Sequence, residues 1–128
     1  MAGKDVREAG LDLRRKMFGK SGAEDRVNNA NDLMRWFEET VITDFCFGDV
    51  WNRKPLDHKM RSMLTVAILA ATGKSPQLRY HVQGAIANGV TMEELREVLI
   101  QVTLYAGIPA GAEGLTIANA VLKEAGLV

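Results

Sequence analysis

Apolar residues recur every three or four positions along most of the chain, a spacing that places them on one face of an α-helix. Polar, Gly-containing segments interrupt this pattern and indicate where helices end. The pattern predicts about six helices, near residues 4–17, 31–47, 57–72, 75–88, 91–106 and 110–125. No segment shows the strict alternation of apolar and polar residues that is typical of a β-strand. We therefore expect a single all-α domain over residues 1–128.

The central pair of predicted helices, the third and the fourth, is joined by a short Gly-Lys-Ser link, which favours antiparallel packing. Ser75 is expected to cap the fourth helix, with Pro76 at its first helical position. Thr91 and Glu94 have the spacing of a capping box at the start of the fifth helix.

The N-terminal part of the chain contains two less regular segments. Residues 19–31 are rich in Gly, Asn and Asp and are expected to form a connecting loop. Residues 48–55 are expected to form an ordered loop, because Trp51 must pack somewhere. Between them, the second predicted helix ends at Gly48. Its broad apolar stripe is made of Leu33, Phe37, Val41 and Phe45.

Composition excludes several classes of function. The 128 residues contain 16 Lys and Arg and 16 Asp and Glu, so the formal net charge is zero. Nucleic-acid modules and polybasic membrane binders carry a basic excess, so neither partner is expected. The N-terminus lacks an apolar signal core, and no apolar run approaches the length of a membrane span. With a single cysteine, the chain is expected to be cytoplasmic.

The sequence predicts neither a metal site nor a cofactor site. The only two histidines, His58 and His81, are far apart and lack the spacing of metal ligands. No Gly-rich phosphate-binding motif is present. Cys46 is interpreted as a small buried hydrophobe rather than a nucleophile, because the sequence places no base beside it.

His81 is the first candidate for chemistry, since it lies in the fourth predicted helix beside Leu78 and Val82. Gln77 precedes it by one turn, and Gly84 follows it by one turn, where a small residue leaves space for another group. One interpretation is a general acid or base in the wall of a pocket. The other is a core histidine bonded to a neighbour, and the pattern alone favours that simpler alternative.

Two further groups of residues could bind an anion. Arg61 interrupts an apolar run of the third helix, where it either meets an anion or, as the pattern favours, forms a salt bridge. Lys59 adds a second positive charge or is simply exposed. Trp51 and Arg53 lie in the preceding loop, which is either a lid over a pocket or a contact between subunits.

Several linked segments also carry a resemblance to a known family. They are residues 47–53, 56–67, 77–81, 85–91, 93–99 and 105–110. In order and spacing they resemble the carboxymuconolactone decarboxylase family over nearly the whole chain. The resemblance implies a small all-α subunit of the alkylhydroperoxidase-like fold. It also implies assembly into a homo-oligomer, a trimer or a hexamer.

The activity that the resemblance implies is the cofactor-independent loss of CO2 from 4-carboxymuconolactone, a step of aromatic-compound catabolism. The product is the 3-oxoadipate enol-lactone. Loss of CO2 leaves an electron pair that the unsaturated lactone carbonyl can accept. The protein needs only to bind the carboxylate substrate, stabilise the developing oxyanion and deliver a proton to carbon.

The resemblance also suggests roles for individual residues. Arg61 would bind the anion or oxyanion, and His81 would transfer the proton. Trp51 and Arg53 would close the pocket. The remaining expected substrate contacts are Lys59 and Gln77.

Two departures from the family pattern keep alternatives open. Gln77 stands where the decarboxylases usually have Glu, and this neutral amide mildly favours an isomerase or cyclase acting on a related lactone. The second departure is His58-Lys59, which stands where the decarboxylases have an Arg-His pair, and it also leaves the substrate open. Separately, Lys74 and Gln77 occupy the cysteine positions of the peroxidase branch, which excludes a CxxC-dependent peroxidase. The alternative to an enzyme is a non-catalytic oligomeric scaffold protein.

Overall fold

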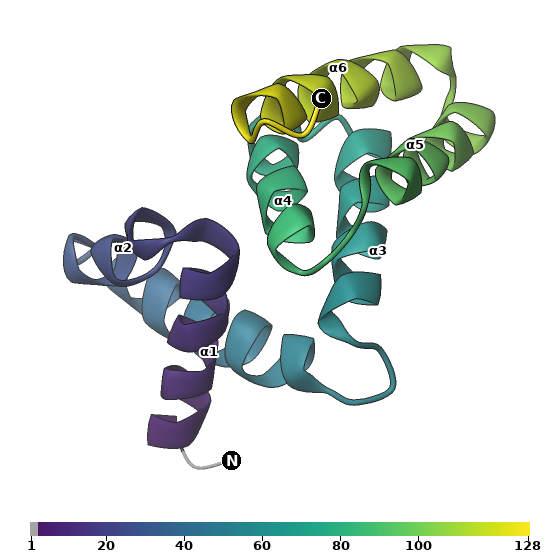
Figure 1. The fold of residues 1–128 in the computed structure, drawn as a ribbon. Helices are drawn as coiled ribbons and strands as arrows, with labels where there is room; N and C mark the ends of the chain where they lie inside the picture. Colours follow the sequence, from purple (N-terminus) through teal and green to yellow (C-terminus); the bar gives the residue numbers. More distant parts are fainter. Residues whose placement is uncertain (1–2) are drawn as a thin grey trace. The chain divides into compact units, whose positions relative to one another are not determined.

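The structure, a computed structural model, describes residues 3–128, with side chains from residue 5 onward. Within this range all regular secondary structure is helical, which confirms the all-α class (Figure 1). The order is α1 (Gly3–Phe18), 3₁₀-helix η1 (Lys20–Gly22), α2 (Glu24–Asn28), π-helix η2 (Phe37–Asp49), 3₁₀-helix η3 (Val50–Asn52), α3 (His58–Ala71), α4 (Ser75–Ala87), α5 (Met92–Ala106) and α6 (Ile108–Glu124). None of these helices is long and apolar enough to cross a membrane.

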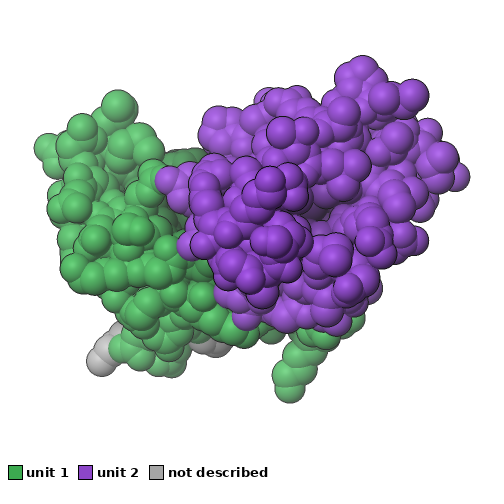
Figure 2. All heavy atoms as spheres, turned by 45° about the horizontal axis from the view of Figure 1, so that its top comes forward, with its two compact units in different colours: residues 1–58 green, residues 59–128 purple. Residues whose placement is uncertain are grey.

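The helices group into two compact units, residues 1–58 and 59–128, which Figure 2 colours separately. Each unit has its own buried apolar cluster. The cluster of the first unit contains Leu13, Met17, Phe47 and Trp51. The larger cluster of the second unit includes Val66, Leu78, Val82 and Leu99. That residues 1–128 act as one domain stays a prediction.

In the first unit, α1 and η2 pack with their backbones in close contact. A Cβ atom added at Gly10 would lie 2.1 Å from the Thr43 carbonyl oxygen, and one added at Gly48 would lie 2.4 Å from that of Val6. Both positions therefore require glycine. Gly48 lies within η2 and does not end the helix, so that prediction was wrong.

The apolar stripe predicted for the second helix is not buried. Leu33, Phe37 and Phe45 are 85, 42 and 58% exposed. The buried positions of η2 include Glu38, Thr43 and Gly48, which lie five residues apart. This is the i→i+5 repeat of a π-helix, so a four-residue spacing does not describe the face that packs against α1.

A buried ion pair holds this packing together. Arg14 of α1 is 4% exposed and its Nη2 donates to Glu38 Oε1 at 2.9 Å. Its Nη1 donates to Thr43 Oγ1 at 2.9 Å, and its Nε donates to the Gly22 carbonyl at 3.0 Å. The last bond ties down the segment between α1 and η2. That segment contains η1 and α2, so the expectation of a plain loop over residues 19–31 was wrong.

In the second unit, α3 and α4 lie antiparallel, as predicted. Asn88, which follows the end of α4, donates from Nδ2 to Ser62 Oγ near the start of α3, at 3.0 Å. At the other end, the Lys74 amide bonds the Leu69 carbonyl at 3.0 Å. Gly73 forms the turn with a φ of 71°, a backbone conformation that favours glycine.

The predicted helix starts had mixed outcomes. Thr91 and Glu94 form the expected capping box, with both reciprocal bonds present. Ser75 does not cap α4, because Lys74 is the N-cap residue and the Ser75 hydroxyl instead donates to Glu113 Oε1 at 2.6 Å. A contact with a residue 38 positions away cannot be read from local sequence.

Candidate functional site

His81 lies in the middle of α4, beside the buried residues Leu78 and Val82. Burial lowers its pKa from 6.5 to about 4, because the protonated ring loses hydration there. The imidazole is therefore neutral at pH 7 in the absence of a ligand. Gln77 is exposed one turn earlier on the same side of the helix.

Arg61 lies on α3, next to Ser62, whose side chain is fully buried and bonded to Asn88. Because α3 and α4 run in opposite directions, Arg61 lies one residue to one side of this bond and His81 seven residues to the other, so their levels along the helix pair differ by about 12 Å. Arg61 and His81 therefore lie on the neighbouring helices α3 and α4 (Figure 1), but at different levels of the pair.

Lys59 lies near the start of α3, where its ammonium group is paired with Glu94 Oε2 at 2.9 Å. Glu94 also accepts from the Thr91 amide in the capping box. These interactions lower the pKa of Glu94, the backbone hydrogen bond from Thr91 most and the bond from Lys59 next. Lys59 therefore has a structural partner at the start of α5.

In the first unit, Trp51 and Arg53 line one open hollow of about 440 Å³. Trp51 is 6% exposed and packs on Phe47 with ring centroids 5.3 Å apart, so the segment is ordered, as expected. Arg53 donates to both carboxylate oxygens of Asp49, at 3.2 and 3.0 Å. This pairing raises the pKa of Arg53 and lowers that of Asp49.

His58, which sequence analysis did not select, lines the same hollow. Its Nε2 lies 2.8 Å from Asn52 Oδ1. The remaining lining residues are Asn52, Lys54, Leu56 and Asp57. The sequence signals for His58 were its place among the charged residues that open the third predicted helix and, with Lys59, its difference from the Arg-His pair of the family.

Cys46 is half-buried in η2, and burial raises the pKa of its thiol. A hydrogen bond with Trp51 partly opposes this effect. The raised pKa disfavours the thiolate that a nucleophilic or peroxidatic role requires.

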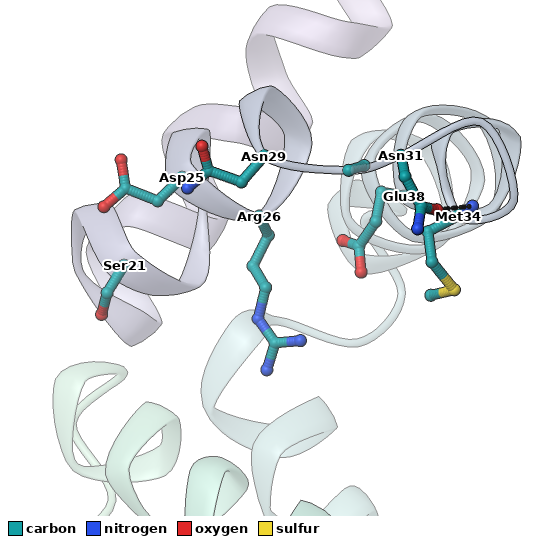
Figure 3. A pocket seen from close by; sticks show the side chains of 8 residues that line it. Ser21, Asp25, Arg26, Asn29, Asn31, Met34 and Glu38 are labelled. Atoms are coloured by element: carbon teal, nitrogen blue, oxygen red, sulfur yellow. Dashed lines mark hydrogen bonds between the residues drawn. The ribbon is translucent and has the colours of Figure 1, made fainter.

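A second hollow of about 330 Å³ in the first unit was not anticipated from the sequence. Figure 3 shows the Arg26 and Glu38 side chains projecting from α2 and η2 among its lining residues. Asn31 also lines this hollow, and its Oδ1 accepts a hydrogen bond from the Met34 amide at 3.1 Å. The Glu38 carboxylate is already neutralised by Arg14, so it contributes to the fold.

Comparison with known proteins gives consistent matches over most of the chain. The model of the carboxymuconolactone decarboxylase family matches residues 31–120. The chain is 36% identical over 118 residues to 4-carboxymuconolactone decarboxylase of Acinetobacter baylyi, covering 92% of this chain and 87% of that protein. It is 32% identical over 117 residues to nitrosuccinic acid decarboxylase of Metarhizium robertsii, covering 91% of this chain and 81% of that protein.

Proposed function

The chain belongs to the carboxymuconolactone decarboxylase family and is a carboxy-lyase, and we propose that it removes CO2 from a carboxylated unsaturated lactone such as 4-carboxymuconolactone, without a cofactor. The observation that carries this substrate class is the 36% identity to the Acinetobacter baylyi enzyme over 92% of the chain. Because both relatives are decarboxylases, the alternative of a non-catalytic scaffold is not supported.

In the proposed reaction, the bond between the ring carbon and the carboxylate breaks, and CO2 leaves. The electron pair moves through the double bond to the lactone carbonyl, and Arg61 stabilises the resulting oxyanion. His81 then gives a proton to carbon. A neutral imidazole is a poor acid, so His81 must first become protonated. A bound anion favours this, because a nearby negative charge raises the pKa of a histidine.

The resemblance to the family supports the other proposed contacts. Trp51, Arg53 and Gln77 would contact the substrate, Gln77 from the turn before His81. Lys59 would share its ammonium group between Glu94 and the substrate. The neutral amide of Gln77 also supports the second candidate, an isomerase or cyclase on a related lactone.

The test is product analysis after incubation with 4-carboxymuconolactone. A decarboxylase yields one CO2 per substrate consumed, together with the enol-lactone. Consumption of the lactone with no CO2 would identify the isomerase or cyclase instead. A His81→Ala variant should lose about 10²- to 10⁴-fold in turnover, the range for removal of a general acid.

We also propose that the chain forms a homo-oligomer, a trimer or a hexamer. The support is a group of large apolar side chains around η2 that a monomer exposes: Leu33, Trp36, Phe37 and Phe45. Several large apolar side chains exposed on one segment favour an interface, and a formal net charge of zero offers no repulsion between copies. Sedimentation velocity should show an oligomer that dissociates in a Trp36→Ser, Phe37→Ser variant. A monomer at micromolar concentration of the natural chain would contradict the proposal.

A further inference from the structure

The turn between α4 and α5 (Figure 1) contains Asn88-Gly89, and no other asparagine of the sequence is followed by glycine. Asparagine is thermolabile because its side-chain amide can react with the main chain. The backbone nitrogen of the next residue attacks the side-chain carbonyl carbon and closes a five-membered succinimide ring. Glycine allows this approach best, since it has no side chain to hinder its nitrogen. This turn therefore holds the residue pair of the chain that is most susceptible to this reaction.

The folded turn keeps the two reacting groups apart. The Gly89 nitrogen donates to the Ile86 carbonyl at 3.0 Å, a bond that must break before this nitrogen can attack. Ring closure also requires the Gly89 nitrogen and Asn88 Cβ to lie on the same side of the Asn88 Cα–C bond. The Asn88 ψ of 10° holds them apart around that bond. The reaction therefore proceeds only when the turn opens locally.

A side-chain contact with α3 opposes this opening. Asn88 Nδ2 donates to Ser62 Oγ at 3.0 Å, and this is the one hydrogen bond of the amide in the described part of the chain. Ser62 is fully buried, whereas Asn88 is half-buried and Gly89 is exposed. The Asn88 Oδ1 atom is buried without a partner among the described residues, which destabilises the closed turn relative to an open one in which water binds this atom. The closed state of the amide thus depends on Ser62.

We propose that Asn88 is a site of spontaneous deamidation, at a rate that the opening of this turn determines and that Ser62 restrains. In the open turn, the Gly89 nitrogen forms a bond to Asn88 Cγ and the Cγ–Nδ2 bond breaks. Ammonia leaves with the proton of the Gly89 nitrogen. One water molecule then hydrolyses the succinimide at either carbonyl, which gives aspartate or isoaspartate, and no oxidant or reductant takes part.

The two products affect the turn differently. Aspartate keeps the course of the main chain, and its carboxylate can accept a hydrogen bond from the Ser62 hydroxyl. Isoaspartate carries the main chain through Cβ and Cγ, which lengthens the backbone within the turn. The Val90 amide, which donates to the Ala85 carbonyl at 2.9 Å, then cannot keep its geometry. Isoaspartate should therefore loosen the end of α4.

The test incubates the folded natural chain and Ser62→Ala at neutral pH and follows deamidation of the Asn88 peptide by mass spectrometry. Ser62→Ala should react at least about fivefold faster, the effect of one lost hydrogen bond on the opening equilibrium. Ser75→Ala is the matched control, because it removes a hydroxyl that bonds Glu113 elsewhere in the second unit, and it should react at the natural rate. Equal rates in the natural chain and Ser62→Ala would overturn the proposal.

Two further measurements separate local opening from other causes. In urea, the natural chain and Ser62→Ala should react at one rate, faster than either folded protein, and a folded rate equal to the unfolded rate would overturn the protection by the turn. Native-state hydrogen exchange at the Gly89 amide should accelerate in Ser62→Ala by the same factor as deamidation. Faster exchange with unchanged deamidation would contradict the proposal. None of these readouts involves turnover, so they do not depend on the proposed reaction.

Discussion

The burial of His81 predicts how the stability of the protein depends on pH. The folded chain holds this ring neutral, with a pKa lowered from 6.5 to about 4 by loss of hydration. Between these two values the unfolded chain binds a proton that the folded chain does not. The stabilising contribution is therefore fully present above pH 6.5 and is lost as the pH falls toward 4.

The size of this effect follows from the shift. A difference of about 2.5 pH units corresponds to about 3.4 kcal/mol over the whole window, at about 1.36 kcal/mol per unit. Between pH 7 and pH 5, above the range in which most carboxylates titrate, the loss amounts to about 2 kcal/mol. Replacing His81 with glutamine removes the titrating group, so this part of the pH dependence should disappear.

Urea unfolding followed by circular dichroism at 222 nm, at pH 7 and pH 5, measures the difference directly. The natural chain should lose about 2 kcal/mol more on acidification than His81→Gln. His58→Gln is the matched control, because it removes the other histidine and should retain the loss that belongs to His81. An equal pH dependence in the natural chain and His81→Gln would refute the buried neutral state of His81.

Urea unfolding of three further variants tests contacts within each of the two units. Arg14→Met leaves the buried Glu38 carboxylate without its partner and should lower the free energy of unfolding by about 3–5 kcal/mol. The double variant Arg14→Met, Glu38→Leu should lose less, and an equal loss in the single and double variants would contradict the pairing. Gly48→Ala places a methyl group 2.4 Å from the Val6 carbonyl and should destabilise the first unit by about 1–3 kcal/mol; a neutral result would contradict the close packing. Thr91→Ala removes the cap of α5 and should cost about 1 kcal/mol, with no loss expected only if the capping box is absent.

The regular part of the fold could be predicted because local sequence determines it. The helices from α3 onward have apolar residues at helical spacing and end at glycines with positive φ, such as Gly73 and Gly89. Their signals agree at short range, so the antiparallel pair and the capping box at Thr91 were found correctly.

The N-terminal part was harder because tertiary contacts determine it. Arg14 donates hydrogen bonds to Gly22, Glu38 and Thr43, which lie on separate segments of the sequence. These bonds hold the three segments together. The π-helical repeat of η2 also changes which residues are buried. Spacings of three and four residues therefore predicted the exposed stripe of Leu33, Phe37 and Phe45 as the buried face. They did not identify the face that is buried.

For the candidate site, sequence analysis selected residues but could not give their surroundings. It chose His81 and Arg61 from two helices that do lie side by side. It did not find the bond between Asn52 and His58, which depends on backbone carbonyls presented by the end of η2. Hydrogen bonds to backbone atoms leave no pattern in side-chain spacing.

We propose that this decarboxylase uses His81 as its proton donor. The most direct test supplies freshly generated 4-carboxymuconolactone to the purified natural chain and to His81→Ala, and measures CO2 release. We expect rapid release by the natural chain and a loss of about 10²- to 10⁴-fold in the variant. Equal release by both proteins would contradict the role of His81, and no release by either would contradict the proposed substrate.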